Sequence, residues 1–187
     1  MPSRLLWPRR RAPAHDELEM IKPKIRSARL TDIPVITRIY AHAVKHGTSS
    51  FELQPPDEAE MARRMNELTS RNFPYLVAEL GDVLAGYAYA APYRTRPAYR
   101  FTVENSVYVA PDIQRRGVGK ALLEELIEAS TERGFRLMVA VIGDSMQAAS
   151  IGVHEATGFS HVGGFENIGY KFDRWLDTVL MQRALGP

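Results

Sequence analysis

The chain lacks cysteine. Disulfides, thiolate nucleophiles and cysteine-ligated zinc or iron–sulfur centres are therefore excluded. No apolar run approaches the ~20 residues that a membrane-spanning helix needs, and a net charge of only +2 gives no support for general nucleic-acid binding. We therefore expect no metal, no membrane and no nucleic-acid partner, and a cytoplasmic location fits this composition.

The remaining composition is that of one globular domain. The 187 residues are 45% hydrophobic and 25% charged, which is ordinary for a globular protein and enough for a substantial core. Residues 1–22 differ from the rest: arginine and proline mix there without a periodic pattern, and no long apolar stretch follows as in a secretory signal. We expect residues 1–22 to be a flexible extension and residues 23–187 to form the domain.

Apolar periodicity and turn residues divide the domain into strands and helices. Strands are expected at 25–28, 75–80, 83–91, 103–109, 136–142, 159–165 and 175–182. Helices are expected at 32–46, after 55–57, at 118–134, and from Asp144 or Ser145 to about 157. The order β-α-α-β-β-β-α-β-α-β-β predicts an α/β fold with one mixed sheet flanked by helices.

The most informative segment is 107–123, where a β-rich run passes through Pro111 into a loop and then a helix. The loop contains Gly117 and Gly119, which allow close approach of a ligand to the backbone. Free amides and the positive end of the helix dipole attract anions, and Arg115, Arg116 and Lys120 add full charges. This combination favours a polyphosphate site over a plain basic loop.

Two common phosphate motifs do not fit this loop. A P-loop would need glycine where Gln114 stands and Ser or Thr where Ala121 stands, and a dinucleotide fingerprint would need glycine at Leu122. What remains is Gln-x-x-Gly-x-Gly after a strand. This motif resembles the acetyl-CoA pyrophosphate loop of the GNAT superfamily of N-acetyltransferases.

Further stretches resemble one branch of that superfamily, the phosphinothricin and methionine sulfoximine N-acetyltransferases. They occur in the right order at 87–96, 99–109, 139–145, 153–159 and 169–177. The resemblance implies the strongly twisted GNAT sheet, acetyl-CoA as donor, a small-molecule amine as acceptor and a homodimer. One departure is Met146-Gln147, where the branch usually has two asparagines.

The resemblance also implies the residues that hold the donor. The backbone of Val107, Tyr108 and Val109 would pair with the pantetheine arm as an added strand does. The other donor-binding residues would be Gln114, Arg115, Arg116, Gly117, Val118, Gly119, Lys120, Ala121, Ser145 and Gln147.

Transfer to an amine needs a base, because an α-ammonium group is mostly protonated near pH 7. Glu104 is the first candidate and His154 the second. The residues alone leave open a solvated glutamate on a strand and a structural histidine on a helix; the resemblance favours catalytic roles. Tyr108 or Tyr170 could protonate the departing thiolate, and the sequence does not choose between them.

The connector 92–101 is the candidate acceptor side. Arg94 and Arg96 offer planar donors to a carboxylate, and Tyr93 and Tyr99 could wall the pocket. Taken alone, these residues are typical of a basic surface loop. Because the connector immediately precedes the strand that carries Glu104, they could instead bind the acidic group of an amino acid. The sequence thus predicts direct acetylation of the α-amine of a small amino acid, with another amine, a protein N-terminus or a non-catalytic CoA sensor as alternatives.

Overall fold

The computed structural model describes residues 22–186. The expected extension 1–22 lies almost wholly outside the described residues. The domain contains seven strands and four α-helices, in the order that the sequence predicts. The strands are β1 Lys24–Ser27, β2 Tyr75–Leu80, β3 Val83–Pro92, β4 Thr102–Val109, β5 Leu137–Gly143, β6 Ser160–Lys171 and β7 Arg174–Ala184. The α-helices are α1 Ile33–His46, α2 Glu58–Ser70, α3 Val118–Glu132 and α4 Ala148–Ala156.

All seven strands form one sheet in the order β1-β2-β3-β4-β5-β7-β6. Every neighbouring pair is antiparallel except β4 and β5. A parallel pair needs a crossover connection, and α3 supplies it. The predicted mixed α/β fold is confirmed.

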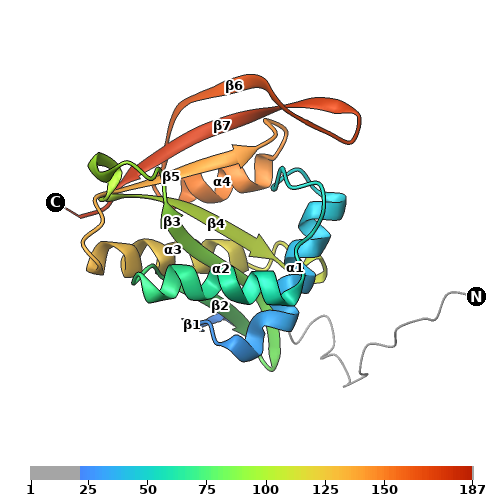
Figure 1. Ribbon diagram of the computed structural model, residues 1–187, viewed down its shortest axis with the longest axis vertical. Helices are drawn as coiled ribbons and strands as arrows, with labels where there is room; N and C mark the ends of the chain where they lie inside the picture. The colour runs from blue at the N-terminus through green and yellow to red at the C-terminus, as the bar shows by residue number, and fades with distance from the viewer. Residues whose placement is uncertain (1–21, 187) are drawn as a thin grey trace, which may run out of the picture.

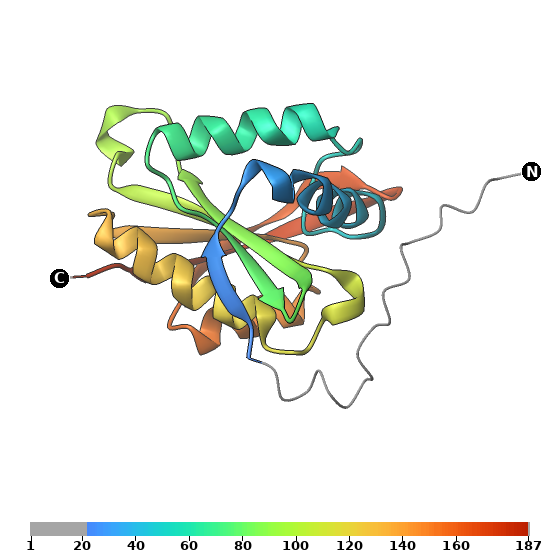
Figure 2. The same ribbon diagram turned by 90° about the horizontal axis from the view of Figure 1, so that it is seen from below.

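The helices cover both faces of the sheet. Figure 2 shows α1 and α2 on one face and α3 and α4 on the other. On the α1–α2 face a cluster built on Ile36, Val44, Met65 and Tyr87 is buried, and on the α3–α4 face a cluster built on Leu122, Leu126 and Met138. Because side chains alternate along a strand, successive residues of β4 point to opposite faces.

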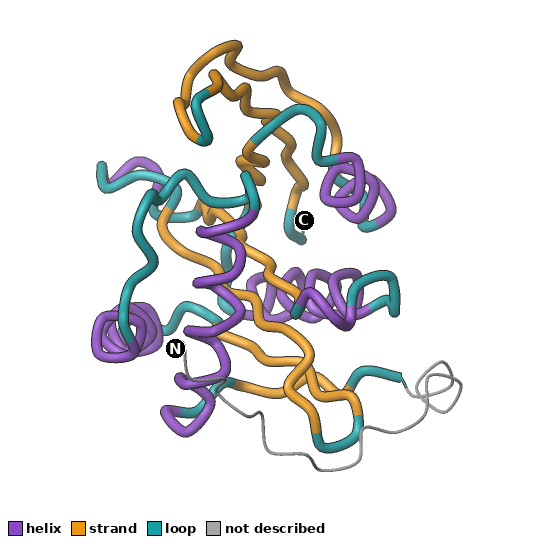
Figure 3. The backbone as a smooth tube through the Cα atoms, turned by 90° about the vertical axis from the view of Figure 1, so that its right-hand side faces the viewer, coloured by secondary structure: helices purple, strands orange, loops and turns teal. Residues whose placement is uncertain are grey.

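The C-terminal hairpin of β6 and β7 extends beyond the body of the sheet (Figures 1 and 3). The hairpin is longer than the sequence predicts, because residues 166–171 continue β6 past the expected end at 165. Its apolar side chains are largely exposed, among them Phe165 and Trp175, which are 53% and 60% exposed.

The start of α4 corrects one expectation. The sequence places the cap at Asp144 or Ser145, but the helix begins at Ala148. Asp144 accepts a hydrogen bond from the amide of Met146 at 3.0 Å and another from Arg174. These bonds hold Asp144 in a turn with φ of 75°, so the helix cannot start there.

Candidate active site

The parallel pairing of β4 with β5 is short. It covers Thr102, Val103 and Glu104 against Leu137, Met138 and Val139. Beyond Glu104, β4 stays paired with β3 as far as Val109, while β5 pairs with β7. Within residues 22–186 the β5-facing edge of β4 therefore has no strand partner from residue 105 onward, and an extended ligand can use its backbone groups.

A pocket of about 350 Å³ lies at this opening. Its walls come from β3, β4, β5, β7, α4 with the residue before it, and the connector between α1 and α2. Its lining includes Phe51, Tyr89, Glu104, Asn105, Tyr108, Gln147 and His154.

Side chains from both faces of the sheet line the pocket. Tyr108 packs in the α1–α2 cluster, and Val107 packs in the α3–α4 cluster. By strand alternation Glu104 shares the face of Tyr108, and Asn105 shares the face of Val107 and α4. A reaction at the opening therefore has Glu104 on one side and His154 on the other.

Glu104 has the electrostatics of a base. Burial raises the pKa of its carboxyl above the usual value, and the positive charge of Arg94 opposes the shift. Tyr89, which also lines the pocket, is hydrogen-bonded through its hydroxyl to Ser106, two residues beyond Glu104 on the same face. A carboxylate with a raised pKa holds a proton more tightly and is better matched to an ammonium group.

His154 is 5% exposed and is surrounded by hydrogen-bond partners. Its Nδ1 lies 2.8 Å from the Ser150 carbonyl oxygen, and its Nε2 lies 3.0 Å from Asn105 Oδ1. Phe159 packs edge-on at 4.9 Å between ring centroids. Burial lowers the pKa of His154, and the bond to Ser150 raises it.

The two tyrosines considered for proton donation have different surroundings. Tyr108 lines the pocket and packs edge-on against Tyr40 at 5.1 Å. Burial raises its pKa well above the usual value, so the hydroxyl keeps its proton. Tyr170 is 55% exposed on β6, with its ring against Trp175 at 5.2 Å, and lies outside the pocket lining.

The loop before α3 has the backbone of an anion site. Arg115 and Gly117 have left-handed φ values of 65° and 74°, and α3 begins at Val118, so Gly119, Lys120 and Ala121 form its first turn. Gln114 and Arg115 are exposed, while Arg116 is half-buried. Lys120 pairs with Glu124 at 3.6 Å, one turn on.

Gln147 and Ser145 occupy different places beside the opening. Gln147 lines the pocket, and its Nε2 donates to Thr48 Oγ1 at 2.8 Å. Ser145 is exposed, and its hydroxyl donates to Asp177 at 3.0 Å. Thus Gln147 faces the opening, while Ser145 bonds to β7.

The connector between α1 and α2, residues 47–57, forms part of the pocket wall and is held there by hydrogen bonds. Lys171 is 4% exposed and donates from Nζ to the carbonyl oxygens of Gly47 and Ser50, at 2.9 and 2.6 Å. Burial lowers the pKa of Lys171, and the charge of Glu52 raises it.

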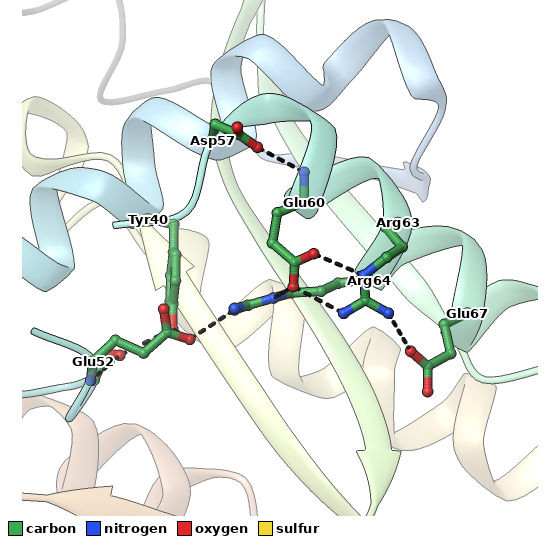
Figure 4. A network of polar contacts seen from close by, with 8 residues as sticks. Tyr40, Glu52, Asp57, Glu60, Arg63, Arg64 and Glu67 are labelled. Carbon is green, nitrogen blue, oxygen red and sulfur yellow. Dashed lines mark hydrogen bonds and ion pairs between the residues drawn. The ribbon is translucent and has the colours of Figure 1, made fainter. Parts of the chain in front are cut away.

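Glu52 ties the same connector to both helices. It accepts hydrogen bonds from the Tyr40 hydroxyl at 3.0 Å and from Arg64 at 2.7 Å, and Arg64 also binds Glu60 (Figure 4). Burial raises the pKa of Tyr40 to about 12. This network fixes the chain on either side of Phe51, whose ring lines the pocket.

The residues of 92–101 lie at the margin of this site. Arg94 is exposed and stacks on Tyr93, with its Cζ 4.5 Å from the ring centroid. Tyr93 and Tyr99 meet edge-on at 5.8 Å. Arg96 is exposed at the start of the short turn Pro97–Tyr99. None of these four residues lines the pocket; Arg94 is linked to it through its electrostatic effect on Glu104.

The pocket-lining residues that the sequence did not indicate include Phe51, Tyr89 and Asn105, and the anchoring role of Lys171 was not foreseen either. Phe51 and Lys171 are far apart in the chain, and no local pattern links them. Asn105 is adjacent to Glu104, so an amide beside a candidate base was a readable signal, but its burial was not. Tyr89 lies opposite Ser106 in the β3–β4 hairpin, so the predicted hairpin register could have found it.

The described residues contain neither a candidate metal-binding cluster nor a helix that could span a membrane. Within the described part of the chain, no group of three His, Cys, Asp or Glu side chains could hold a metal ion. The helices from residue 22 to 186 include none with the length and apolarity to cross a membrane.

Comparison with known proteins gives consistent results. Residues 25–180 match the acetyltransferase (GNAT) domain family. A phosphinothricin N-acetyltransferase from Alcaligenes faecalis is 50% identical over 169 residues, covering 90% of this chain and 86% of that protein. An L-methionine sulfoximine/L-methionine sulfone acetyltransferase from Pseudomonas paraeruginosa is 41% identical, covering 87% of this chain and 95% of that protein.

A solved structure agrees as well. A GNAT superfamily phosphinothricin acetyltransferase from Sinorhizobium meliloti, crystallised with acetyl-CoA, superposes with a TM-score of 0.85 at 45% identity, covering 88% of this chain and 89% of that one. The family expected from the Gln-x-x-Gly-x-Gly loop is thereby confirmed. This chain belongs to the GNAT family and is an N-acetyltransferase.

Proposed function

We propose that this protein transfers the acetyl group of acetyl-CoA to the α-amine of a small amino acid of the methionine sulfoximine, methionine sulfone or phosphinothricin type. The observation that carries the proposal is the opening between β4 and β5, with Glu104 on one face and a phosphate-type loop at the end of β4. The names of the similar proteins supply the substrate class.

The residues around the opening fit acetyl-CoA. The left-handed turns at Arg115 and Gly117 bring amides together ahead of α3, and such amides at a helix N-terminus bind phosphate. Arg115, Arg116 and Lys120 add charge, and residues 107–109 offer the free strand edge to the pantetheine arm. Gln147 reaches the arm from the pocket wall. The donor supplies an acetyl group activated as a thioester.

Glu104 acts as the general base in this proposal. It accepts the ammonium proton directly or through a water, and its raised pKa improves the match to that group. An amide of residues 107–109 donates to the thioester oxygen. Of the two tyrosines, Tyr108 is the proton donor to the leaving thiolate in this proposal, because it lines the pocket and Tyr170 does not.

Arg94 and Arg96 provide the positive end of the acceptor site. Arg94 is held by stacking on Tyr93 and acts electrostatically on Glu104. A carboxylate bound between the arginines would leave the α-amine of the same amino acid facing Glu104. Cationic acceptors such as polyamines would be repelled.

We also propose that the protein works as a cytoplasmic homodimer. The support for a dimer is the β6–β7 hairpin, whose exposed apolar side chains are Val162, Phe165, Ile168, Tyr170, Phe172 and Trp175. Apolar side chains gathered on one projecting element are typical of an interface. The proposed use of acetyl-CoA as donor is the support for a cytoplasmic location.

The test is release of CoA thiol from acetyl-CoA with a panel of amines: methionine sulfoximine, methionine sulfone, phosphinothricin, unmodified amino acids, a polyamine and an N-terminal peptide. We expect turnover with the first three and none with the polyamine. Turnover only with the peptide or polyamine would overturn the substrate class, and thermal stabilisation by CoA without any turnover would indicate a sensor.

A further inference from the structure

Asn105 occupies the point where β4 and β5 part. The last β4–β5 pair is Glu104 with Val139, and Asn105 is the next residue of β4. Its Nδ2 donates to the Val139 carbonyl oxygen at 3.1 Å. A buried carbonyl without a donor costs free energy, so the Asn105 side chain provides β5 with the hydrogen bond that the next ladder rung would otherwise provide.

The other half of the amide faces α4. Because Nδ2 is turned to Val139, Oδ1 is the atom that lies 3.0 Å from His154 Nε2. An amide oxygen only accepts, so this contact is a hydrogen bond only when the proton is on Nε2. The second ring nitrogen, Nδ1, lies 2.8 Å from the carbonyl oxygen of Ser150, which also only accepts. A neutral imidazole carries one N–H, so Asn105 and Ser150 compete for the same proton.

Both nitrogens of His154 are therefore directed at acceptors of the protein. A general base needs a free lone pair within reach of the amine. The ionisable neighbours do not change this: Glu104 lies across the sheet, and Glu155 on α4 bonds to His161 at 3.0 Å. The ring is also fixed by Phe159.

We propose that Asn105 is a positioning residue: it sets the place where the sheet opens for the donor and holds His154 so that the ring takes no proton from the acceptor amine. This rests on the proposed function in placing the amine beside Glu104. His154 then serves as the fixed partner that keeps the Asn105 amide turned toward Val139.

The first experiment needs no substrate. Ring nitrogens of ¹⁵N-histidine in the full chain are observed by NMR at pH 8, with His154 assigned by its loss in His154→Gln. We expect Nε2 to carry a proton in the wild type. Asn105→Ala removes the acceptor and should leave Nε2 unprotonated and Nδ1 protonated. The matched variant Asn105→Asp keeps an acceptor for Nε2 and should retain its proton.

An unprotonated Nε2 in the wild type, or no change in Asn105→Ala, would overturn the proposal. These outcomes stand even if the acceptor class proves to be different. Absence of acetyl transfer by the wild type would instead contradict the proposed function and leave the NMR result intact. If Asn105→Ala does not fold, the wild-type and Asn105→Asp spectra decide.

A double-mutant cycle gives the kinetic test. Asn105→Ala and His154→Gln should each lower kcat by up to about tenfold, the equivalent of one buried hydrogen bond. The double variant should lose no more than the larger single loss, because the two residues act as one unit. The acidic limb of the pH profile, set by Glu104, should not move. Losses that multiply, or an acidic limb that disappears with His154, would overturn the proposal.

Discussion

The ring of Phe51 occupies the space beside Gly169 that a side chain would need. An ideal Cβ on Gly169 would lie far closer to the Phe51 ring than van der Waals contact allows, and one on Gly143 would collide with the Thr48 carbonyl oxygen and with the same ring from β5. Phe51 is thus held between two glycines, with the pocket beside it. The two glycines are required for space and not for backbone conformation, since neither has a left-handed φ.

Gly169→Ala should displace Phe51 and alter the acceptor pocket. We expect KM for the acceptor to rise and KM for acetyl-CoA to change less, because Phe51 lines the pocket that contains Glu104 and does not belong to the loop before α3. Steady-state kinetics with each substrate varied checks this. Gly152→Ala is the matched control: a Cβ there meets nothing within 4 Å, and alanine favours a helix by about 1 kcal/mol over glycine. Equal effects of the two variants would contradict the assignment.

Lys171→Met should loosen the connector. The substitution leaves the carbonyls of Gly47 and Ser50 without the ammonium donor, and hydrogen bonds to charged groups contribute about 1.5–3 kcal/mol each. We expect a lower free energy of unfolding together with a raised KM for the acceptor, measured by urea denaturation and kinetics. The control is Lys45→Met on the exposed side of α1, which should leave both quantities near wild type.

Glu104→Gln should lower turnover by roughly 10²–10⁴-fold at neutral pH, the usual effect of losing a general base. The loss should shrink as pH rises, because more of the amine is then already neutral. Near-normal turnover at pH 7 would remove Glu104 from the mechanism. Thermal shift with CoA, expected to be unchanged, serves as the binding control.

Glu104→Gln should also make the folded protein more stable than the wild type at neutral pH. Burial raises the pKa of Glu104 in the folded state, so the folded protein holds this proton more tightly than the unfolded chain. Its contribution to stability is therefore present below the unfolded pKa and is lost as pH rises through the folded value. Glu104→Gln should melt at a higher temperature than wild type at pH 7–8, with the difference vanishing near pH 4.

A comparison of Arg94→Ala with Arg96→Ala should distinguish the roles of the two arginines in the connector 92–101. Both should raise KM for an acidic acceptor, each by the loss of a charge-assisted hydrogen bond of about 1.5–3 kcal/mol. Only Arg94→Ala should also shift the acidic limb of kcat/KM to higher pH, because Arg94 lowers the pKa of Glu104. Equal shifts in both variants, or none, would contradict this distinction.

Arg116→Glu should weaken donor binding by placing an anion at the phosphate loop. Saturating CoA should raise the Tm of the wild type by mass action and raise that of the variant less. Glu124→Gln, which removes the partner of Lys120, is the control and should not weaken the shift. No shift in the wild type with millimolar CoA would contradict the donor assignment.

The sequence predicts well the features that depend on neighbouring residues. The order of elements and the loop at 114–121 follow from apolar periodicity, glycine and helix-start signals, which act over a few residues. The start of α4 was misplaced because Arg174 of β7 binds Asp144, and a local capping signal does not report a contact from 30 residues away.

Glu104 and the loop before α3 could be named as candidates from the sequence because both belong to one continuous segment, β4 and its exit. The tertiary structure alone decided the rest. It ended the β4–β5 pairing at Glu104, placed Asn105 between Val139 and His154, and brought Lys171 to Gly47 across 124 residues. These contacts depend on how the strands are ordered and where two of them separate, which is set by packing on both faces of the sheet and leaves no periodic trace in the chain.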